Sequence, residues 1–358
     1  MTVATWALFG LVAAAAAARL PSAAPAPSGL RILSDVALPP ALVWASDVRW
    51  ASERSVYVAA AREGTFEVST DPSGPPTKEL IPGAAKPGGF WGCHRIAASS
   101  HYLVAAGPAL SLTWRRIDDP VRTDAAFEAI QAIDVHDGQL AVVGARRDSS
   151  GKFGPEGAIA WIGSLDKQLA DLRPLLFDVA GAGVPTMNRC LGAELGATRF
   201  VADGSLLVLA GVQPGMSLYD RQGKLLRTWD TAAMGIDADC PSLSDAAGMR
   251  LARNAQERQL WLNQRRVVST ILPLPAGPGL VVRRVEKSRT RWDLKVIHGD
   301  GSVASFAVPI EGPSEFYALA GDVRAGKIVF LLREKVFRGG ATSRPAPPHL
   351  IIASAPAG

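Results

Sequence analysis

A stretch of four short strand-like runs within residues 195–229 constrains the fold of this chain more than any other part of the sequence. The runs cover 197–201, 206–210, 216–220 and 225–229. Glycine, aspartate or proline separates them and strand-forming residues fill them, which is typical of a four-stranded antiparallel meander. Such a sheet leaves both faces apolar, so the rest of the chain must supply further sheets that pack against it.

Degenerate copies of this meander recur along the chain. The 358 residues include 35 glycines and 26 prolines, a turn-rich content, and 48% are hydrophobic, which is enough to bury a large core. The sequence predicts an all-β fold, a six-bladed β-propeller. Five or seven blades stay open as alternatives because residues 246–266 could contain an extra strand pair. The expected blades cover residues 46–70, 93–116, 129–178, 195–230, 268–310 and 316–355.

The two ends of the chain are expected to meet in the last blade. Only three strands are visible within residues 316–355, whereas the strand-like run 29–38 has no partner nearby in the sequence. Adding this run as the fourth strand leaves no blade with an incomplete edge. We therefore expect an N-terminal strand to complete the last blade.

A motif within residues 201–229 resembles a known group of propellers. It reads D-G-x-L-x-V and then Y-D-x-x-G-K-L-L-R-x-W. This pattern is similar to the NHL-repeat and TolB-like group of six-bladed β-propellers, over roughly a tenth of the chain. The resemblance implies ligand or protein binding, the group's common activity, and it implies no particular site residue.

The first residues predict export. Residues 1–18 end in a run of small apolar residues that is shorter than the roughly 20 needed to span a bilayer, and small-residue cleavage sites follow it. No basic residue precedes the run and Arg19 follows it, which opposes the usual charge bias. We expect a signal peptide at 1–18, a Pro/Ala linker at 19–28, and a secreted or periplasmic protein of bacterial type. An uncleaved anchor and a misassigned start are the alternatives.

Three cysteines, Cys93, Cys190 and Cys240, bear on the redox state of an exported protein. Cys190 and Cys240 flank the meander at 195–229, on connections that should reach the same side, so they are a candidate disulfide. Three unpaired, partly buried thiols are an equally good interpretation, because spacing alone does not fix a pairing.

The connections between the expected strands fall into two groups. In an up-and-down blade, the first-to-second and third-to-fourth turns share one face, and the second-to-third turns and interblade crossings share the other. The first group is tight throughout. Long loops on a rigid scaffold usually carry binding sites, so the second face is the expected working face. Its long segments are 71–92, 146–157, 166–193, 230–266, 284–290 and 334–348.

Positive charge gathers on this expected face, and the net charge of the chain is +5. Its arginines could hold an anionic partner, or they could be ordinary solvated side chains, because Asp and Glu lie among them. On the inner strands, Arg49, Arg95 and Arg199 align, with aspartates near the same level. These arginines could clamp a carboxylate or phosphate, or they could pair with the aspartates and fix the ring. The candidate ligand-binding residues are Arg49, Arg95, Arg199, Trp91, His94, Asp322, Arg283, Arg284 and Arg289.

Catalytic and metal-binding patterns are poor. The five histidines show no HExxH spacing and no serine lies in a GxSxG elbow. Cys93 and His94 are neighbours on a strand and should point to opposite faces. Asp237 and Asp239 offer too few ligands for a calcium loop.

We therefore expect a non-catalytic, monomeric binding module without a cofactor, which holds a protein or anionic glycan and neither binds nucleic acid nor inserts stably into a membrane. A lactonase-like or lyase-like propeller enzyme with an axial site is the first alternative. A structural surface protein is the second.

Overall fold

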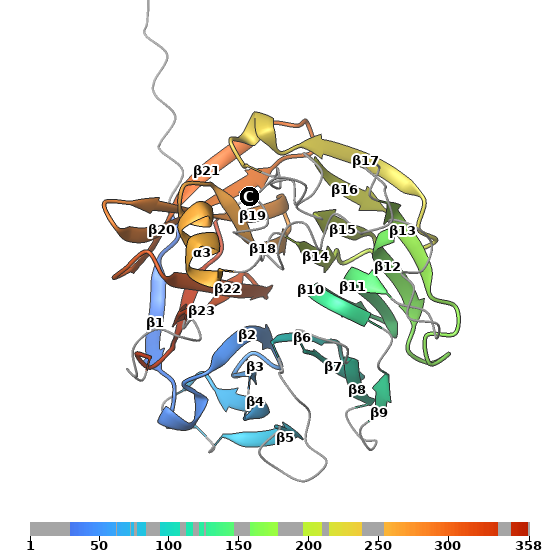
Figure 1. The fold of residues 1–358 in the computed structure, drawn as a ribbon, viewed down its shortest axis with the longest axis horizontal. Helices are drawn as coiled ribbons and strands as arrows, with labels where there is room; N and C mark the ends of the chain where they lie inside the picture. Colours follow the sequence, from blue (N-terminus) through green and yellow to red (C-terminus); the bar gives the residue numbers. More distant parts are fainter. Residues whose placement is uncertain are drawn as a thin grey trace, which may run out of the picture.

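The computed structural model shows an all-β molecule whose sheets are arranged around a central axis (Figure 1). The structure describes residues 29–356, apart from 62, 72, 75–76, 84–93, 108–111, 117–121, 125–126, 147–157, 178–195, 210–214, 238–253 and 336–344. Each sheet has four strands and is antiparallel throughout, as expected when successive strands are joined by short turns. We number the sheets one to six in the order of their innermost strands.

The first three sheets follow the chain from the innermost strand outward. Sheet one comprises β2 (Ala45–Trp50), β3 (Ser55–Ala60), β4 (Gly64–Ser69) and β5 (Lys78–Pro82). Sheet two comprises β6 (Arg95–Ala98), β7 (Tyr102–Ala106), β8 (Leu112–Arg116) and β9 (Arg122–Asp124). Sheet three comprises β10 (Phe127–His136), β11 (Gln139–Arg146), β12 (Ala158–Ser164) and β13 (Arg173–Phe177).

The next two sheets repeat this order and the last one departs from it. Sheet four comprises β14 (Ala197–Phe200), β15 (Leu206–Leu209), β16 (Gly215–Tyr219) and β17 (Leu225–Asp230). Sheet five comprises β18 (Val267–Leu274), β19 (Gly277–Glu286), β20 (Arg289–Ile297) and β21 (Val303–Gly312). Sheet six comprises β22 (Tyr317–Arg324), β23 (Lys327–Glu334), β24 (His349–Ser354) and, outermost, β1 (Ile32–Ala37).

Strand β1 joins the beginning of the described chain to its end. It pairs antiparallel with β24, with Asp35 opposite Ile351 and Ala37 opposite His349. The backbone N–H of Leu38 donates to Pro348 O at 2.8 Å, and His349 Nδ1 lies 2.8 Å from Asp35 Oδ1. Sheet six therefore takes its fourth strand from the other end of the chain.

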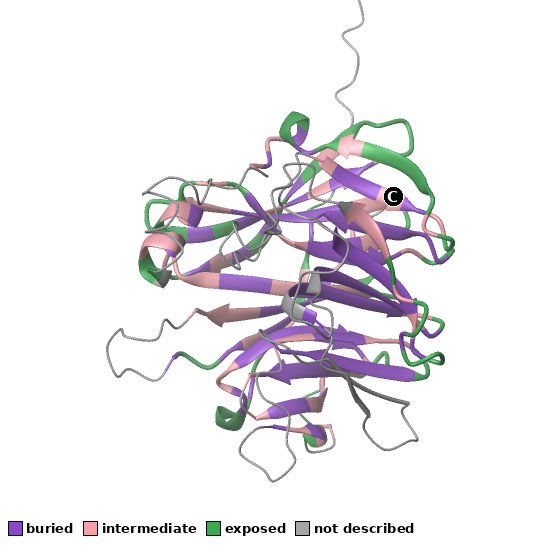
Figure 2. Cartoon of the chain, turned by 45° about the vertical axis from the view of Figure 1, so that its right-hand side comes forward, coloured by how far each residue is buried: buried purple, intermediate pink, exposed green. Residues whose placement is uncertain are grey.

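The core lies between the faces of neighbouring sheets. The innermost strands β2, β6, β10, β14, β18 and β22 contact one another in a ring, and Figure 2 shows buried residues along them, with exposed residues at turns and outer strands. Trp161 and Phe127 fill the space between sheets two and three, and Trp292 and Phe330 fill that between sheets five and six. Strands β2 and β7 are buried at every position rather than at alternate positions, because both of their faces are covered.

One of the segments expected to be long loops is a tight hairpin, and another contains a strand in its described part. The predicted segment 284–290 is a two-residue turn between β19 and β20, in which Lys287 and Ser288 adopt φ values of 50° and 61°, as a tight hairpin requires. The predicted segment 166–193 contains β13. Its start belongs to the β12–β13 turn, where buried Leu165 and Leu169 pack into the core. The expectation for 284–290 was wrong because its charged residues belong to two strands that continue up to the turn. Residues 178–193 of the other segment lie outside the described ranges.

The region expected to hide a possible strand pair contains a helix in its described part. Asn254 caps the N-terminus of helix α3 (Ala255–Asn263). Its side chain accepts hydrogen bonds from the N–H groups of Gln256 and Glu257 at 3.0 and 3.1 Å. This arrangement is a good N-cap because it satisfies amides that have no partner within the helix. Two single-turn 3-10 helices, η1 (Pro40–Leu42) and η2 (Ala232–Met234), complete the described elements.

Several sequence predictions fall on residues outside the described ranges. They are the signal peptide at 1–18, the linker at 19–28, Trp91, Cys93 and the candidate disulfide between Cys190 and Cys240. Within the described ranges, no helix has the length and apolar character needed to cross a bilayer.

Candidate axial site

The inner strands give the central axis two distinguishable ends. Strand β2 runs from Ala45 to Trp50 and then enters the tight turn 51–54, and the other inner strands run in the same sense. We call the end where the inner strands begin the long-loop end, and the end where they finish the tight-turn end. A pocket lies at each end.

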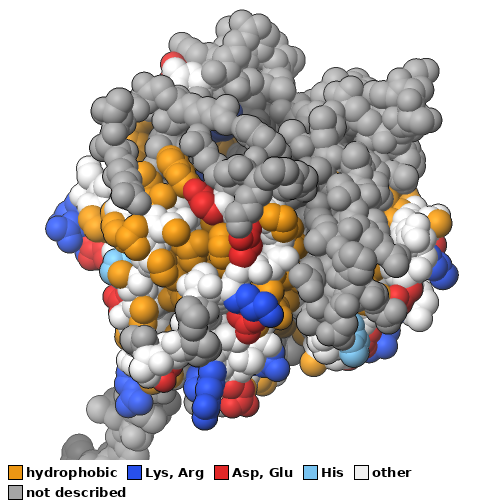
Figure 3. Space-filling model, turned by 90° about the horizontal axis from the view of Figure 1, so that it is seen from below, with side chains coloured by type: hydrophobic (Ala, Val, Ile, Leu, Met, Phe, Trp, Pro, Cys, Tyr) orange, Lys and Arg blue, Asp and Glu red, His pale blue; other side chains and the backbone are white. Residues whose placement is uncertain are grey.

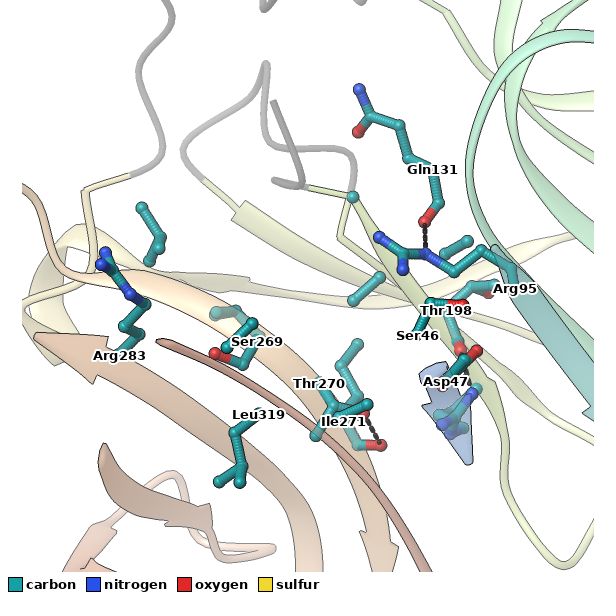
Figure 4. Close-up of a pocket in the computed structure, with 18 of the residues that line it drawn as sticks. Ser46, Asp47, Arg95, Gln131, Thr198, Ser269, Thr270, Ile271, Arg283 and Leu319 are labelled. Atoms are coloured by element: carbon teal, nitrogen blue, oxygen red, sulfur yellow. Dashed lines mark hydrogen bonds between the residues drawn. The ribbon is translucent and has the colours of Figure 1, made fainter. Parts of the chain in front are cut away.

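The pocket toward the long-loop end, here called the axial pocket, is lined from all six sheets and from α3 (Figure 4). Its lining is strongly cationic. Among the described lining residues there are six basic side chains and a single carboxylate, that of Asp47. The basic residues are Arg49, Arg95, Arg199, Arg283, Arg333 and Lys335.

Asp47 and Arg49 form a buried ion pair at the base of this pocket. Arg49 Nη1 donates to Asp47 Oδ1 at 2.8 Å and to Val48 O at 2.7 Å, and the Arg49 side chain is only 7% exposed. Asp47 Oδ2 also accepts the backbone N–H of Ile96 in sheet two at 3.1 Å. One carboxylate therefore neutralises a buried guanidinium and joins two sheets.

Two further aspartates join neighbouring sheets in the same way. Asp134 Oδ2 accepts the N–H of Phe200 at 2.7 Å, linking sheets three and four. Asp322 Oδ2 accepts the N–H of Trp50 at 2.9 Å, linking sheets six and one. The aspartates seen near one level in the sequence thus act as staples between the inner strands, because each satisfies a backbone donor of the next sheet.

Arg199 occupies the middle of the axis and is less tightly paired than Arg49. Its Nη1 lies 3.7 Å from Asp134 Oδ1, and its Nη2 donates to Gly321 O across the axis at 3.1 Å. Burial lowers the pKa of Arg199, and the neighbouring Arg49 charge lowers it further. The arginine nevertheless remains protonated, because its ordinary pKa is so high.

Burial and neighbouring charges both shift the pKa values of Arg49 and Asp134. Burial disfavours the charge on Arg49, but Asp47, Asp322 and Asp134 outweigh this effect and raise the Arg49 pKa. Burial raises the pKa of Asp134, and the attraction of Arg199 opposes this only in part. The group is therefore a coupled set of charges in which desolvation is the dominant cost.

Arg95 also lines the axial pocket and is partly exposed. Its Nε donates to Gln131 O at 2.7 Å and its Nη1 donates to His94 O at 3.2 Å, and within the described residues it forms no ion pair. Figure 4 shows the Arg95 guanidinium at the backbone carbonyl of Gln131. A cation held only by neutral carbonyls keeps most of its attraction for an incoming anion.

Gln131 is the least satisfied polar side chain of the pocket. It is 4% exposed, and neither Oε1 nor Nε2 has a hydrogen-bond partner in the structure described. A Cβ on Gly196 would lie 2.5 Å from Gln131 Oε1, so glycine at that position leaves room for the carboxamide. A buried amide without partners is costly unless something binds it.

Arg283 is held by α3 and by the start of sheet six. Its Nη2 donates to Asn263 Oδ1 and to Glu315 O, both at 2.6 Å, and the residue is 3% exposed. Helix α3 also contributes Leu262 to the pocket lining. The helix therefore fixes one cationic side chain of the axial pocket and adds an apolar one.

The second pocket, here called the tight-turn pocket, has a more evenly charged lining. It contains three arginines, Arg49, Arg199 and Arg324, and two aspartates, Asp134 and Asp322. Its remaining lining includes an aromatic pair, since His136 stacks on Phe200 with ring centroids 5.7 Å apart. Its buried arginines are paired with aspartates within the protein, whereas the exposed Arg324 donates to Ala51 O at 3.1 Å.

The other candidate arginines lie in surface ion pairs of sheet five. Arg284 Nε is 2.8 Å from Asp293 Oδ2, and Arg284 also pairs with Glu286. Arg289 Nη1 is 3.0 Å from Glu311 Oε1. The side of the molecule in Figure 3 likewise intersperses acidic and basic side chains rather than gathering one basic patch.

The structure thus brings together some of the predicted site residues and separates others. Arg49, Arg95, Arg199 and Arg283 line the axial pocket, and the carbonyl of His94 borders it through Arg95. Asp322 belongs to the tight-turn pocket, whereas Arg284 and Arg289 lie in the surface pairs. Sequence reasoning missed Gln131 and α3, and no signal pointed to Gln131, because a single glutamine within a strand looks like an ordinary polar residue.

Within the described residues, no group of three or more His, Cys, Asp or Glu side chains is placed to hold a metal ion. The aspartates at the axis already bind arginines and backbone N–H groups. The described chemistry of the axial pocket is that of hydrogen-bond donors and positive charge.

Comparisons with known proteins identify the fold and no family. No protein-family model matches the chain, and no curated protein matches it in sequence. Solved structures do match. A member of the DUF4221 family from Bacteroides vulgatus has a TM-score of 0.55 and 8% sequence identity, and the match covers 91% of this chain and 97% of that one.

Two further solved structures are similar over most of their length. Regucalcin, a calcium-binding protein from Agrobacterium tumefaciens, has a TM-score of 0.48 and 10% identity, covering 92% of this chain and 94% of that one. Virginiamycin B lyase from Staphylococcus aureus has a TM-score of 0.43 and 9% identity, covering 91% of this chain and 99% of that one. At these identities the likeness concerns the fold alone: the chain is an all-β propeller, as its sequence predicted.

Proposed function

We propose that this protein is a non-catalytic binding module that holds a protein or glycan partner on its long-loop end, with an anionic group of the partner in the axial pocket. The observation that carries the proposal is the excess of basic over acidic side chains in that pocket, six to one among its described lining residues. Elsewhere, arginines such as Arg284 and Arg289 have carboxylate partners. An anion would therefore gain most at the axis.

The same proposal includes the number of blades, the oligomeric state and the location of the module. We infer a ring of six blades completed by the N-terminal strand, for which the six four-stranded sheets and the β1–β24 register are the support. We also infer a monomer that is exported to the periplasm or medium, since the apolar residues 1–18 and the linker 19–28 suit a cleaved signal. Amino-terminal sequencing of the protein from culture tests this, because an intact Met1 in exported protein would contradict cleavage.

The experiment for the binding site uses two acidic polymers as probes, polyglutamate and a polyuronate, immobilised on a sensor surface. Arg95→Gln should weaken retention by about tenfold or more, because it removes the cation without an ion pair. Arg291→Gln is the charge-matched control: Arg291 lies in surface pairs with Glu286 and Glu311, and its loss should change affinity by less than about twofold. Equal losses in both variants would mean that only net charge matters and would overturn the proposal.

A further inference from the structure

The axial pocket has a second side that charge does not explain. Opposite Arg95, its lining is aliphatic and includes Leu262, Val267 and Leu319, each no more than 7% exposed. None of the described lining residues is aromatic. The pocket therefore offers small apolar contacts as well as cations, and Val267 lies beside the cationic Arg283 in the sheet.

The size of the pocket limits what can enter. Its cavity volume is about 70 Å³. A water molecule needs roughly 10–15 Å³ of such volume, so the space suits a group of roughly five heavy atoms. A carboxylate, the carbon that bears it and a methyl group have about this size, so the rest of a larger ligand has to lie outside this volume.

Gln131 adds a third requirement. Its buried carboxamide has an unused donor and an unused acceptor, and its own backbone carbonyl binds Arg95 at 2.7 Å, while the side chain extends away from that guanidinium (Figure 4). A peptide group offers a complementary acceptor and donor. In a polypeptide, the last peptide group stands one residue away from the terminal carboxylate, which matches this arrangement.

We propose that the axial pocket binds the carboxyl terminus of a partner polypeptide that ends in a small aliphatic residue, alanine or valine. The terminal carboxylate pairs with Arg95, the side chain packs on Leu262, Val267 and Leu319, and the last peptide group pairs with Gln131. This inference rests on the proposed binding role and names the partner's chemistry. Capture of a terminal carboxylate is an established mode of peptide recognition, and aromatic platforms that would favour a glycan are lacking among the described lining residues.

The test uses two pools of hexapeptides with a Gly/Ser body and all amino acids at the last two positions, one pool with free carboxylates and the other with carboxamides. The full-length protein is dialysed against each pool, and the bound peptides are identified by mass spectrometry. Free-acid peptides ending in alanine or valine should be enriched about tenfold or more over their amides, because only the free acid pairs with Arg95.

Three variants separate the parts of the proposal. Arg95→Gln should weaken binding of the selected free-acid peptide by about tenfold or more, and Arg291→Gln by less than about twofold. Gln131→Leu should weaken binding roughly threefold to tenfold while leaving the free protein at least as stable, because it removes a buried amide that has no partner. A merely structural glutamine would instead show a loss of stability.

The outcomes distinguish this inference from the proposed function. Equal binding of acids and amides, insensitivity to Arg95, or no enrichment at about millimolar peptide would overturn the peptide assignment. If retention of the polyuronate and polyglutamate still depends on Arg95 in that case, the anion site stands and its occupant is a different acidic group, such as a uronate. If polymer retention is also independent of Arg95, both proposals fall.

Discussion

The two ends of the central axis use the same types of side chain for different purposes. At the tight-turn end, Asp134 and Asp322 accept backbone N–H groups of the next sheet, and Arg199 lies between them. At the long-loop end, Arg95 contacts only carbonyl groups and Gln131 has no hydrogen-bond partner within the described structure. At the tight-turn end the buried arginines are paired with aspartates, although Arg49 Nε, Arg199 Nε and Trp50 Nε1 have no hydrogen-bond partner in the described structure. The long-loop end retains a cation without an ion pair and an amide without any partner.

This difference teaches how to divide buried charge into structural and binding parts. A charged group that already has its partners gives little to a ligand, since the ligand would have to displace those partners. A charged or polar group that is held in place but not satisfied is preorganised for binding. Arg49 belongs to both parts, because it lines both pockets and is paired with Asp47, one of the aspartates that join the sheets.

The sharpest test of the structural part is Asp47→Ala. It removes the partner of buried Arg49 and leaves the N–H groups of Val48 and Ile96 without their acceptor. We expect the free energy of unfolding to fall by about 3–5 kcal/mol, the usual cost of leaving a buried charge alone. Urea denaturation followed by tryptophan fluorescence measures it. The control Asp137→Asn, at a carboxylate whose side chain is 69% exposed, should cost less than about 1 kcal/mol.

Arg95→Gln should instead weaken anion binding more than it lowers the free energy of unfolding. Its loss of anion binding by about tenfold corresponds to about 1.4 kcal/mol, whereas the free energy of unfolding should change by less than about 1 kcal/mol, because Arg95 is partly exposed and bonds only to carbonyl groups. Parallel denaturation and binding measurements on one preparation give both quantities. If stability fell as far as it does in Asp47→Ala, Arg95 would belong with the structural charges and the comparison would fail.

The pH dependence of stability should have opposite signs at the two kinds of aspartate. Burial raises the pKa of Asp134, so the folded protein keeps a proton there after the unfolded chain has released it. Stability from this group is present at low pH and is lost as pH rises from about 3.8 through the raised pKa. In the turn 202–204, the N–H of Ser205 lowers the pKa of Asp203, so its contribution is present above about 3.8 and is lost as pH falls through the lowered pKa.

Two asparagine variants isolate these signs. The stability of the native chain relative to Asp134→Asn should decline as pH rises, whereas its stability relative to Asp203→Asn should increase as pH rises. Urea midpoints measured between acid and neutral pH provide both curves. Parallel curves in the same direction would contradict the assignment of Asp134 as a carboxylate governed by burial.

Much of the fold was predictable, and its least predictable parts concern side chains. Turns such as 202–204 and 299–301 contain glycines with positive φ, Gly204 at 81° and Gly301 at 90°, and a sequence announces such turns directly. The hairpin at Lys287 and Ser288 contains no glycine, so it was mistaken for a loop. Helix α3 was missed because its residues are mostly polar and its cap, Asn254, looks like part of a loop.

The candidate site was predictable only in outline. Alignment of the expected inner strands placed Arg49, Arg95 and Arg199 together, and the structure places all three on the axial pocket. Which of them is already paired depends on distances between sheets, such as Asp47 to Ile96, and a sequence contains no such distances. The isolation of Gln131 depends on the same long-range packing.

The smallest effect expected concerns the surface pairs of sheet five, which the sequence suggested as part of the site. Glu311 lies near Arg289 at 3.0 Å and near Arg291 at 3.6 Å, and both arginine side chains are about half exposed. Because solvent screens such pairs, Glu311→Ala and Arg289→Ala should each lower the free energy of unfolding by less than about 1 kcal/mol, with a coupling of about 0.5 kcal/mol or less in a double-mutant cycle. Arg289→Glu should also leave retention on polyglutamate within about twofold of the native value. A larger loss of retention would extend the binding surface from the axis to sheet five, and the division between satisfied and available charge would then have to be drawn elsewhere.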